Sequence, residues 1–161
     1  MQDILITTEG IQKNLKNVKA LDALCEYIWN GFDAQASEVR IDLHVNEFDF
    51  INEITVADNG TGIAYEELKY KFKPFNESKK GDSKKKTNHT LPHGRQGLGR
   101  LTFFSFAQKA RWDTVYEKDD KHYSYYIEMD RDSLNQYNDN DGKSPIETDK
   151  SLGTSVKFFQ T

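Results

Sequence analysis

Three polar side chains recur at helical spacing in the segment 20–36, which reads ALDALCEYIWNGFDAQA. Glu26, Asn30 and Asp33 follow one another at intervals of four and three residues, so a helix would stack them on one face. A carboxylate, an amide and a second carboxylate in one column can polarise a water molecule and bind a hard metal ion. The alternative interpretation is a solvated helix face, which this segment taken alone would favour.

The same segment carries an apolar stripe, which predicts the amphipathic helix that would position these side chains. The members of the stripe recur at helical spacing and are Leu21, Leu24, Cys25, Ile28, Trp29 and Phe32. Cys25 is the single cysteine of the chain, so no internal disulfide can form. Its place in the stripe predicts a buried thiol.

A second candidate site follows a predicted strand at 54–57. Ile54 and Val56 alternate with Thr55 and Ala57, and the same period turns Asp58 toward the core, where a carboxylate needs a partner. The glycines of the next residues, DNGTGI at 58–63, let the backbone turn tightly and approach a flat ligand. A carboxylate there can accept a hydrogen bond from the amino group of adenine. The alternative is an ordinary Asn-Gly turn.

A third candidate, GRQGLGR at 94–100, has the composition of an anion site. Its glycines leave backbone N–H groups accessible, a predicted helix follows, and Arg95 and Arg100 add positive charge. The spacing is neither that of a Walker loop nor that of the dinucleotide fingerprint. A fourth segment, Gly153-Thr154, begins a predicted strand and carries little information alone.

The rest of the pattern predicts the framework for these segments. In chain order we expect a short strand at 4–7, a helical turn at 11–15, a half-buried strand at 39–45, a helix at 64–72, a helix at 96–107, a hairpin of strands 110–116 and 123–129, an exposed loop at 130–150 and a last strand at 154–159. In the helix at 96–107, Leu98, Leu101, Phe104 and also Ser105 would face inward. This order favours an α+β fold, with a mixed or mostly antiparallel sheet and helices on one face.

Length and charge narrow the possible functions. The 161 residues suffice for a single domain at 1–161, and the net charge of −4 gives no overall basic field for nucleic acid or an anionic membrane. No apolar run approaches the roughly 20 residues that a membrane span needs. The N-terminus lacks the apolar core of a signal peptide, so we expect a cytoplasmic protein with no membrane association.

Taken in this order, the four segments resemble the motifs of the GHKL ATPases, the superfamily of DNA gyrase B, the ninety-kilodalton heat-shock chaperone, histidine kinases and MutL. The matching patterns are Glu26-x-x-x-Asn30-x-x-Asp33, Asp58-x-Gly60-x-Gly62, Gly94-x-x-Gly97-x-Gly99 and Gly153-Thr154. The resemblance covers about residues 20–159. It implies the Bergerat-type α/β sandwich, with ATP between the sheet and a lid at about 73–95, in the N-terminal part of a longer protein.

The resemblance also implies a role for each matching residue. Glu26 would be the general base that activates water, Asn30 would ligate Mg²⁺, and Asp33 would line the pocket. Asp58 would bind the adenine amino group, and Thr154 would support that bond through water. The other nucleotide-binding residues would be Gly60, Gly62, Ile63, Gln96, Gly97, Leu98, Gly99 and Arg100.

The activity that this resemblance implies is Mg-dependent ATP hydrolysis, slow in the isolated domain, that drives a conformational switch in a larger protein. The pattern after the lid is nearest to the chaperone-like ATPase domains. The alternatives are a histidine or protein kinase catalytic domain, and a nucleotide-sensing module without turnover. The partners would be ATP and a protein or DNA client that acts through other domains, with ATP-dependent dimerisation of the full-length protein.

Overall fold

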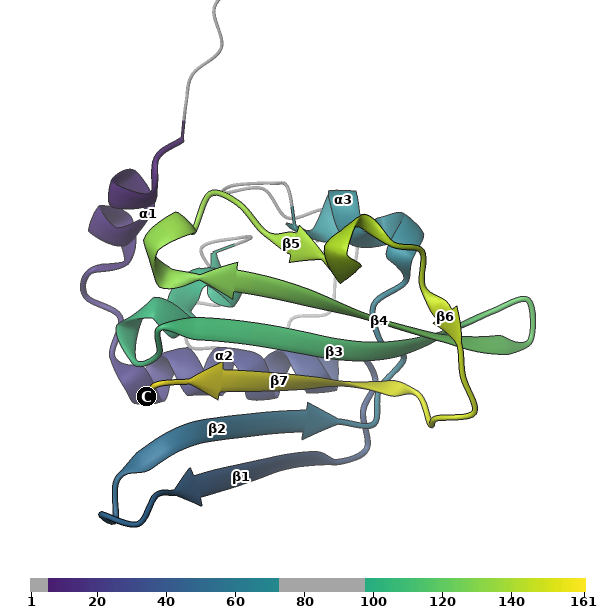
Figure 1. Ribbon diagram of the computed structural model, residues 1–161, viewed down its shortest axis with the longest axis horizontal. Coiled ribbons are helices and arrows are strands. Elements are labelled where there is room, and N and C mark those ends of the chain that lie inside the picture. The colour runs from purple at the N-terminus through teal and green to yellow at the C-terminus, as the bar shows by residue number, and fades with distance from the viewer. Residues whose placement is uncertain (1–5, 73–97) are drawn as a thin grey trace, which may run out of the picture.

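The structure, a computed structural model, describes residues 6–72 and 98–161, which form one antiparallel sheet with helices on one face (Figure 1). The strand order is β1-β2-β7-β3-β4-β5, and β6 also pairs with β4. The strands are β1 (Val39–Val45), β2 (Ile51–Asp58), β3 (Lys109–Lys118), β4 (Lys121–Asp130), β5 (Asn138–Asp139), β6 (Ile146–Glu147) and β7 (Gly153–Phe159). The helices are α1 (Thr8–Leu15), α2 (Ala20–Asp33) and α3 (Leu68–Phe72), with 3-10 segments η1 (Tyr65–Glu67), η2 (Gly99–Ser105), η3 (Arg131–Ser133) and η4 (Asn140–Gly142). The expected α+β class is confirmed.

The strand that follows all others in the sequence, β7, lies in the middle of the sheet. It pairs with β2 on one side and with β3 on the other, both antiparallel. In this register Thr154 is opposite Asp58 on β2 and opposite Thr114 on β3. Three residues from distant parts of the chain therefore form one row across the sheet.

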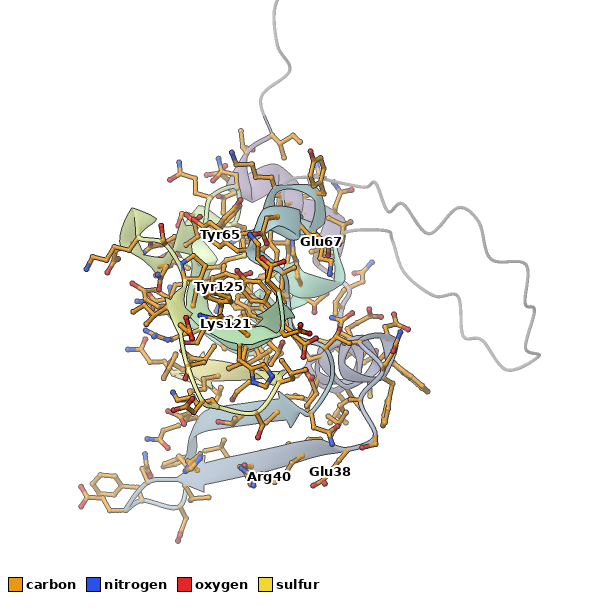
Figure 2. The ribbon with its side chains drawn as sticks, turned by 90° about the vertical axis from the view of Figure 1, so that its right-hand side faces the viewer. Glu38, Arg40, Tyr65, Glu67, Lys121 and Tyr125 are labelled. Atoms are coloured by element: carbon orange, nitrogen blue, oxygen red, sulfur yellow. The ribbon has the colours of Figure 1, made fainter. Side chains whose placement is uncertain are left out.

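The core lies between the sheet and the helices. Figure 1 shows α2 behind β3 and β7, and the turned view of Figure 2 shows it almost end-on beside the sheet. The ring of Tyr27 on α2 packs edge-on against Phe158 with centroids 4.7 Å apart, and Phe72 packs against Trp112 at 5.6 Å. These aromatic contacts hold α2 and α3 on the same face of the sheet. None of the helices in the described part is long and apolar enough to cross a membrane.

The predicted apolar stripe of α2 is wrong in part, because the helix is turned differently. The face against the core consists of Ala23, Tyr27 and Gly31, while Leu24 and Ile28 are only partly buried. The other members of the predicted stripe are exposed: Leu21, Cys25, Trp29 and Phe32. Small side chains allow close approach to the sheet, and Tyr27 can be buried because its hydroxyl donates to the carbonyl of Arg100 at 2.8 Å. The predicted buried thiol of Cys25 is therefore wrong.

The strand at 39–45 is present, but its predicted half-burial is wrong over most of its length. Ile41, Leu43 and Val45 are 41%, 54% and 54% exposed. The reason is position: β1 is the edge strand, and among the described elements α2 covers β1 only near its first residue, Val39.

Three other expectations need correction. Residues 6–7 are not strand, because Thr7 caps α1 by accepting a hydrogen bond from Gly10 N; residues 4–5 lie outside the described part. The segment after residue 98 is the 3-10 helix η2, in which Thr102 and Phe103 are buried as well as Leu101 and Phe104, and Ser105 is only half-buried. The segment 130–150 contains η3, β5, η4 and β6, with Leu134 and Asn140 buried, so it is not simply an exposed loop.

Candidate functional site

Asp58 ends β2 and is fixed by two backbone donors. Its Oδ1 accepts hydrogen bonds from the N–H of Gly60 at 2.8 Å and from the N–H of Thr154 at 3.3 Å. Burial raises the pKa of the Asp58 carboxyl above its ordinary value, while these two hydrogen bonds act in the opposite direction. Both hydrogen bonds end on Oδ1, and together they orient the carboxylate. The second oxygen, Oδ2, takes no part in these two bonds.

Glycines from three segments approach Asp58 where a side chain would not fit. A Cβ at Gly31 of α2 would lie 3.0 Å from the Asp58 Cβ, and one at Gly60 would lie 3.0 Å from its Oδ1. Gly153, with φ of +140°, would place a Cβ only 2.1 Å from the Asp58 carbonyl oxygen. Backbone at three glycines therefore packs directly against Asp58, and a glycine in or beside a strand can mark such a close approach.

The corner after Asp58 is supported from β3 and β4. At Gly62, with φ of +72°, a Cβ would lie 2.0 Å from the carbonyl oxygen of Val115. The next residue, Ile63, donates its N–H to Thr114 Oγ1 at 2.9 Å, and its carbonyl accepts from the Tyr125 hydroxyl at 3.0 Å. Figure 2 shows Tyr125 close to Tyr65, and their ring centroids are 5.0 Å apart. The corner is thus fixed on both sides of Ile63.

Glu26 lies beside the third glycine segment. A Cβ at Gly99 would lie 2.8 Å from Glu26 Oε2, so the backbone of Gly99 and this carboxylate are in direct contact. Glu26 is half-buried on α2, five residues before Gly31, where the helix contacts Asp58. The helix therefore contacts Gly99 through Glu26 and Asp58 through Gly31.

Asn30 and Asp33 follow Glu26 on α2, and both are exposed. Within residues 6–72 and 98–161, no group of three or more His, Cys, Asp and Glu side chains is placed to hold a metal ion. A divalent cation here would take most of its ligands from water and from the oxygens of a bound molecule, as Mg²⁺ commonly does.

Arg100 is bound to the end of α3. Its Nη2 donates to the carbonyl of Phe72 at 2.7 Å, and the guanidinium lies over the Phe72 ring, 5.5 Å from the centroid. Burial lowers the pKa of Arg100 to about 10. Leu98, directly before η2, is buried. Gln96, Gly97, Arg95, Gly94 and the expected lid at 73–95 lie outside the described residues.

Two residues that the sequence analysis missed contact this site. Gly31 interrupts a helix that otherwise favours larger residues, and such a glycine can indicate close packing. Thr114 occupies an inward position of β3 among Ala110, Trp112 and Tyr116, and a polar residue at such a position needs a partner. Both signals are readable in the sequence, although neither identifies the partner.

Comparison with known proteins identifies the architecture. The family model described as "Histidine kinase-, DNA gyrase B-, and HSP90-like ATPase" matches residues 18–159. A putative type II restriction enzyme, HgiDII of Herpetosiphon aurantiacus, is 30% identical over 103 residues, which are 64% of this chain and 15% of that protein.

Among solved structures, the N-terminal domain of a DNA repair protein superposes with a TM-score of 0.54 at 18% identity, over 88% of this chain and 35% of that one. The Aquifex aeolicus MutL ATPase domain complexed with ADP gives a TM-score of 0.48 at 18% identity, over 88% of this chain and 42% of that one. The chain thus spans less than half the length of each of these relatives.

Proposed function

This chain belongs to the family of histidine kinase-, DNA gyrase B- and HSP90-like ATPases, and we propose that it binds ATP at Asp58 and hydrolyses it with Glu26 as general base. The observation that carries the proposal is the convergence of glycine backbone on two carboxylates. Gly31, Gly60 and Gly153 surround Asp58, and Gly99 contacts Glu26. In this proposal the nucleobase lies against Asp58 and the phosphates lie near Glu26.

Each group has a simple task in this proposal. Asp58 accepts a hydrogen bond from the exocyclic amino group of adenine, and Gly60, Gly62 and Ile63 form the corner beside the base. Backbone N–H groups of the segment 97–99 bind the phosphates. Glu26 takes a proton from the water whose oxygen attacks the γ-phosphorus, while the bond to the β–γ bridging oxygen breaks and ADP leaves.

Mg²⁺ would supply charge neutralisation at the phosphates when bound, as it does in phosphoryl transfer generally. The side chain that would hold it is Asn30, which is exposed on α2 one turn after Glu26. One amide oxygen is enough, since Mg²⁺ commonly keeps several waters and phosphate oxygens as ligands. Asp33, one turn farther, would line the same pocket. Thr154 would support the hydrogen bond between Asp58 and adenine.

The test is Glu26→Gln, which keeps the size of the side chain but removes the base. We expect phosphate release to fall by at least about 100-fold, while the ATP dissociation constant from calorimetry changes by less than about threefold. Glu47→Gln, at an exposed turn residue, is the matched control and should release phosphate at the wild-type rate. Wild-type turnover in Glu26→Gln would remove this residue from the proposed role.

The fate of the phosphate separates hydrolysis from the two alternatives. With γ-labelled ATP, free labelled phosphate supports the hydrolase. Label on a protein histidine or serine would support a kinase, and tight binding with neither product would support a nucleotide-sensing module.

We further propose that the ATPase acts as a switch for a client in a larger protein. The names of two relatives, a restriction enzyme and a DNA repair protein, support DNA or a DNA-bound protein as that client. Phosphate release by the full-length protein, measured with and without duplex DNA, tests this. Dimerisation with ATP and a cytoplasmic location stay predictions.

A further inference from the structure

The outer backbone edge of β1 is open among the described residues, where β2 is the one strand that pairs with it. Figures 1 and 2 place β1 at the lower margin of the molecule. At the start of the ladder, the carbonyl of Glu38 accepts the N–H of Asn59, the residue after β2, at 3.3 Å. Backbone groups alternate in direction along an antiparallel strand, so the N–H and C=O of Val39, Ile41 and Leu43 point away from β2.

The side chains of β1 alternate between the two faces of the sheet, and the two faces differ in kind. The odd-numbered residues are apolar and lie on the helix face, where Val39 packs against α2 while Ile41 and Leu43 are exposed. The residues at 38–44 on the other face are all polar or charged: Glu38, Arg40, Asp42 and His44. Arg40 Nε donates to Asp42 Oδ2 at 2.9 Å, and the Arg40 side chain is 68% exposed. An open edge strand with exposed apolar residues is a template for pairing with another chain.

The sequence of this strand is complementary to its own reverse. Residues 38–44 read EVRIDLH, with Ile41 in the middle. In two copies of β1 that lie antiparallel about a two-fold axis at Ile41, the facing pairs would be Ile41 with Ile41, Val39 with Leu43, Arg40 with Asp42 and Glu38 with His44. Every apolar side chain would meet an apolar one, and Arg40 would meet a carboxylate. The ring N–H of His44 could donate to the Glu38 carboxylate.

Neighbouring registers are less favourable. An axis at Asp42 would set two carboxylates directly against each other, and an axis at Arg40 would do the same with two guanidinium groups, which is destabilising. An axis at Leu43 would run the pairing into the irregularity of the ladder after His44. The axis at Ile41 also uses the outward backbone groups, because the N–H and C=O of each Ile41 would bond with those of the other.

We propose that two copies of this chain associate through β1, antiparallel about a two-fold axis at Ile41, so that the two sheets join into one. The pairing is isologous, since the same strand serves on both copies and neither β1 is left open to a third copy. It does not rest on the proposed ATP binding and needs no nucleotide. One pair of strands is a small interface, so the dissociation constant should be on the order of 10 μM.

Sedimentation equilibrium of the whole chain without nucleotide tests the pairing. Wild type should dimerise, and Arg40→Asp and Asp42→Arg should each weaken association by at least about tenfold, because each sets like charges opposite. The double variant that carries both changes should dimerise again, and a mixture of the two single variants should form a heterodimer, because opposite charges face each other once more. Lys143→Asp, an equal charge change at an exposed residue of another segment, should dimerise like wild type.

Amide hydrogen exchange measured by NMR locates the interface. As the wild-type concentration rises, the N–H groups of Ile41 and Leu43 should exchange more slowly, while that of Asp42, which points toward β2, should not change. Arg40→Asp should show no such protection. The inference is overturned if wild type stays monomeric at about a hundred times the expected dissociation constant. It is also overturned if a dimer forms without protecting Ile41, or if a dimer needs ATP. These wild-type measurements decide the outcome should a variant not fold.

Discussion

At the scale of single residues, Asp58 shows how backbone N–H groups can orient a carboxylate. Two backbone N–H groups bind its Oδ1, and Gly31, Gly60 and Gly153 pack against the residue. The partial burial that raises its pKa also lowers the local dielectric, in which a hydrogen bond to a ligand is stronger. The cost of this arrangement falls on the ligand-free protein, because the charged form is the less favourable one when buried.

That cost predicts a dependence of stability on pH. Because the pKa of Asp58 is raised in the folded state, the folded protein binds the carboxyl proton more tightly than the unfolded chain does. The contribution of Asp58 to the free energy of unfolding is therefore fully present below its ordinary pKa of about 4, and it is lost as pH rises through the folded value. Urea titrations of wild type and Asp58→Asn across this pH range give two free energies of unfolding. The wild-type value minus the Asp58→Asn value should decline as the pH rises. A flat difference would contradict the raised pKa.

The positions of single residues could be predicted from the sequence where a local pattern indicates them. The alternation of β2 points Asp58 inward, and the structure places it against the glycine corners. The same reasoning did not predict the Thr114 contact, because its partners Ile63 and Thr154 are 51 and 40 residues away in the chain. For Cys25 the pattern predicted burial, but burial depends on how the helix is turned, and the thiol is exposed.

At the scale of elements, α2 connects the proposed catalytic and base-binding ends of the site. Its Ala23 and Gly31 allow the helix to lie close to the sheet, and Tyr27 between them fills the space against Phe158. Close packing of this kind fixes the distance from Glu26 to Asp58 through one rigid element. A change in the packing of α2 should therefore affect ligand binding as well as stability.

Gly31→Ala tests that connection. Alanine gains about 1 kcal/mol in helix propensity, but the added methyl would lie 2.9 Å from Val39 Cγ2 and 3.0 Å from Asp58 Cβ. Overpacking of this kind costs about 1–3 kcal/mol, so we expect a net loss of up to about 2 kcal/mol and weaker ATP binding. Urea unfolding and calorimetry measure both.

Gly10→Ala in α1 is the matched control for this substitution. Among the described residues its Cβ would meet Thr7 Oγ1 alone, at 3.3 Å, and both residues are exposed, so the neighbour can move. We expect unchanged or slightly increased stability and unchanged ATP affinity. If Gly31→Ala behaves like Gly10→Ala, the close contact of α2 with Asp58 does not matter for binding.

The sequence predicted most elements but not their orientation in the fold. Helical and alternating periods found α2, β1, β2 and the β3–β4 hairpin, since those signals are local. The buried face of α2 was predicted wrongly because tyrosine, alanine and glycine were not counted as core residues. The exposure of β1 depends on its place at the sheet edge, which a local pattern does not contain.

At the scale of the whole molecule, one part of the described surface is apolar. The turn between β1 and β2 exposes Phe48 and Phe50, and α2 exposes Leu21. Leu21 and Phe50 line the same groove, with a volume of about 480 Å³, together with Leu24, Ile54 and Phe106. The groove lies at the end of the sheet where β1 and β2 are joined, away from the Asp58 ends of these strands.

Phe50→Ser should lower the affinity of this surface for apolar dyes without unfolding the protein. Phe50 is 69% exposed, so the change in unfolding free energy should stay within about 0.5 kcal/mol. Fluorescence of an anilinonaphthalene sulfonate dye and a urea titration measure the two effects. Phe103→Ala, at a fully buried position, should instead cost about 3–5 kcal/mol. A large destabilisation by Phe50→Ser would mean that this ring packs in solution.

The central position of β7 bears on the order of folding. The hairpins β1–β2 and β3–β4 are local, but they are joined in the sheet only through β7, which pairs with β2 and β3 across long stretches of sequence. Closing such long loops is slow, so we expect β7 to dock late. Thr154 enters the sheet with that strand, so the proposed nucleobase site would be completed only in this last step. ATP would bind the folded protein and not the unfolded chain. A free ATP concentration of 100 times the dissociation constant would then add about 2.7 kcal/mol to the free energy of unfolding.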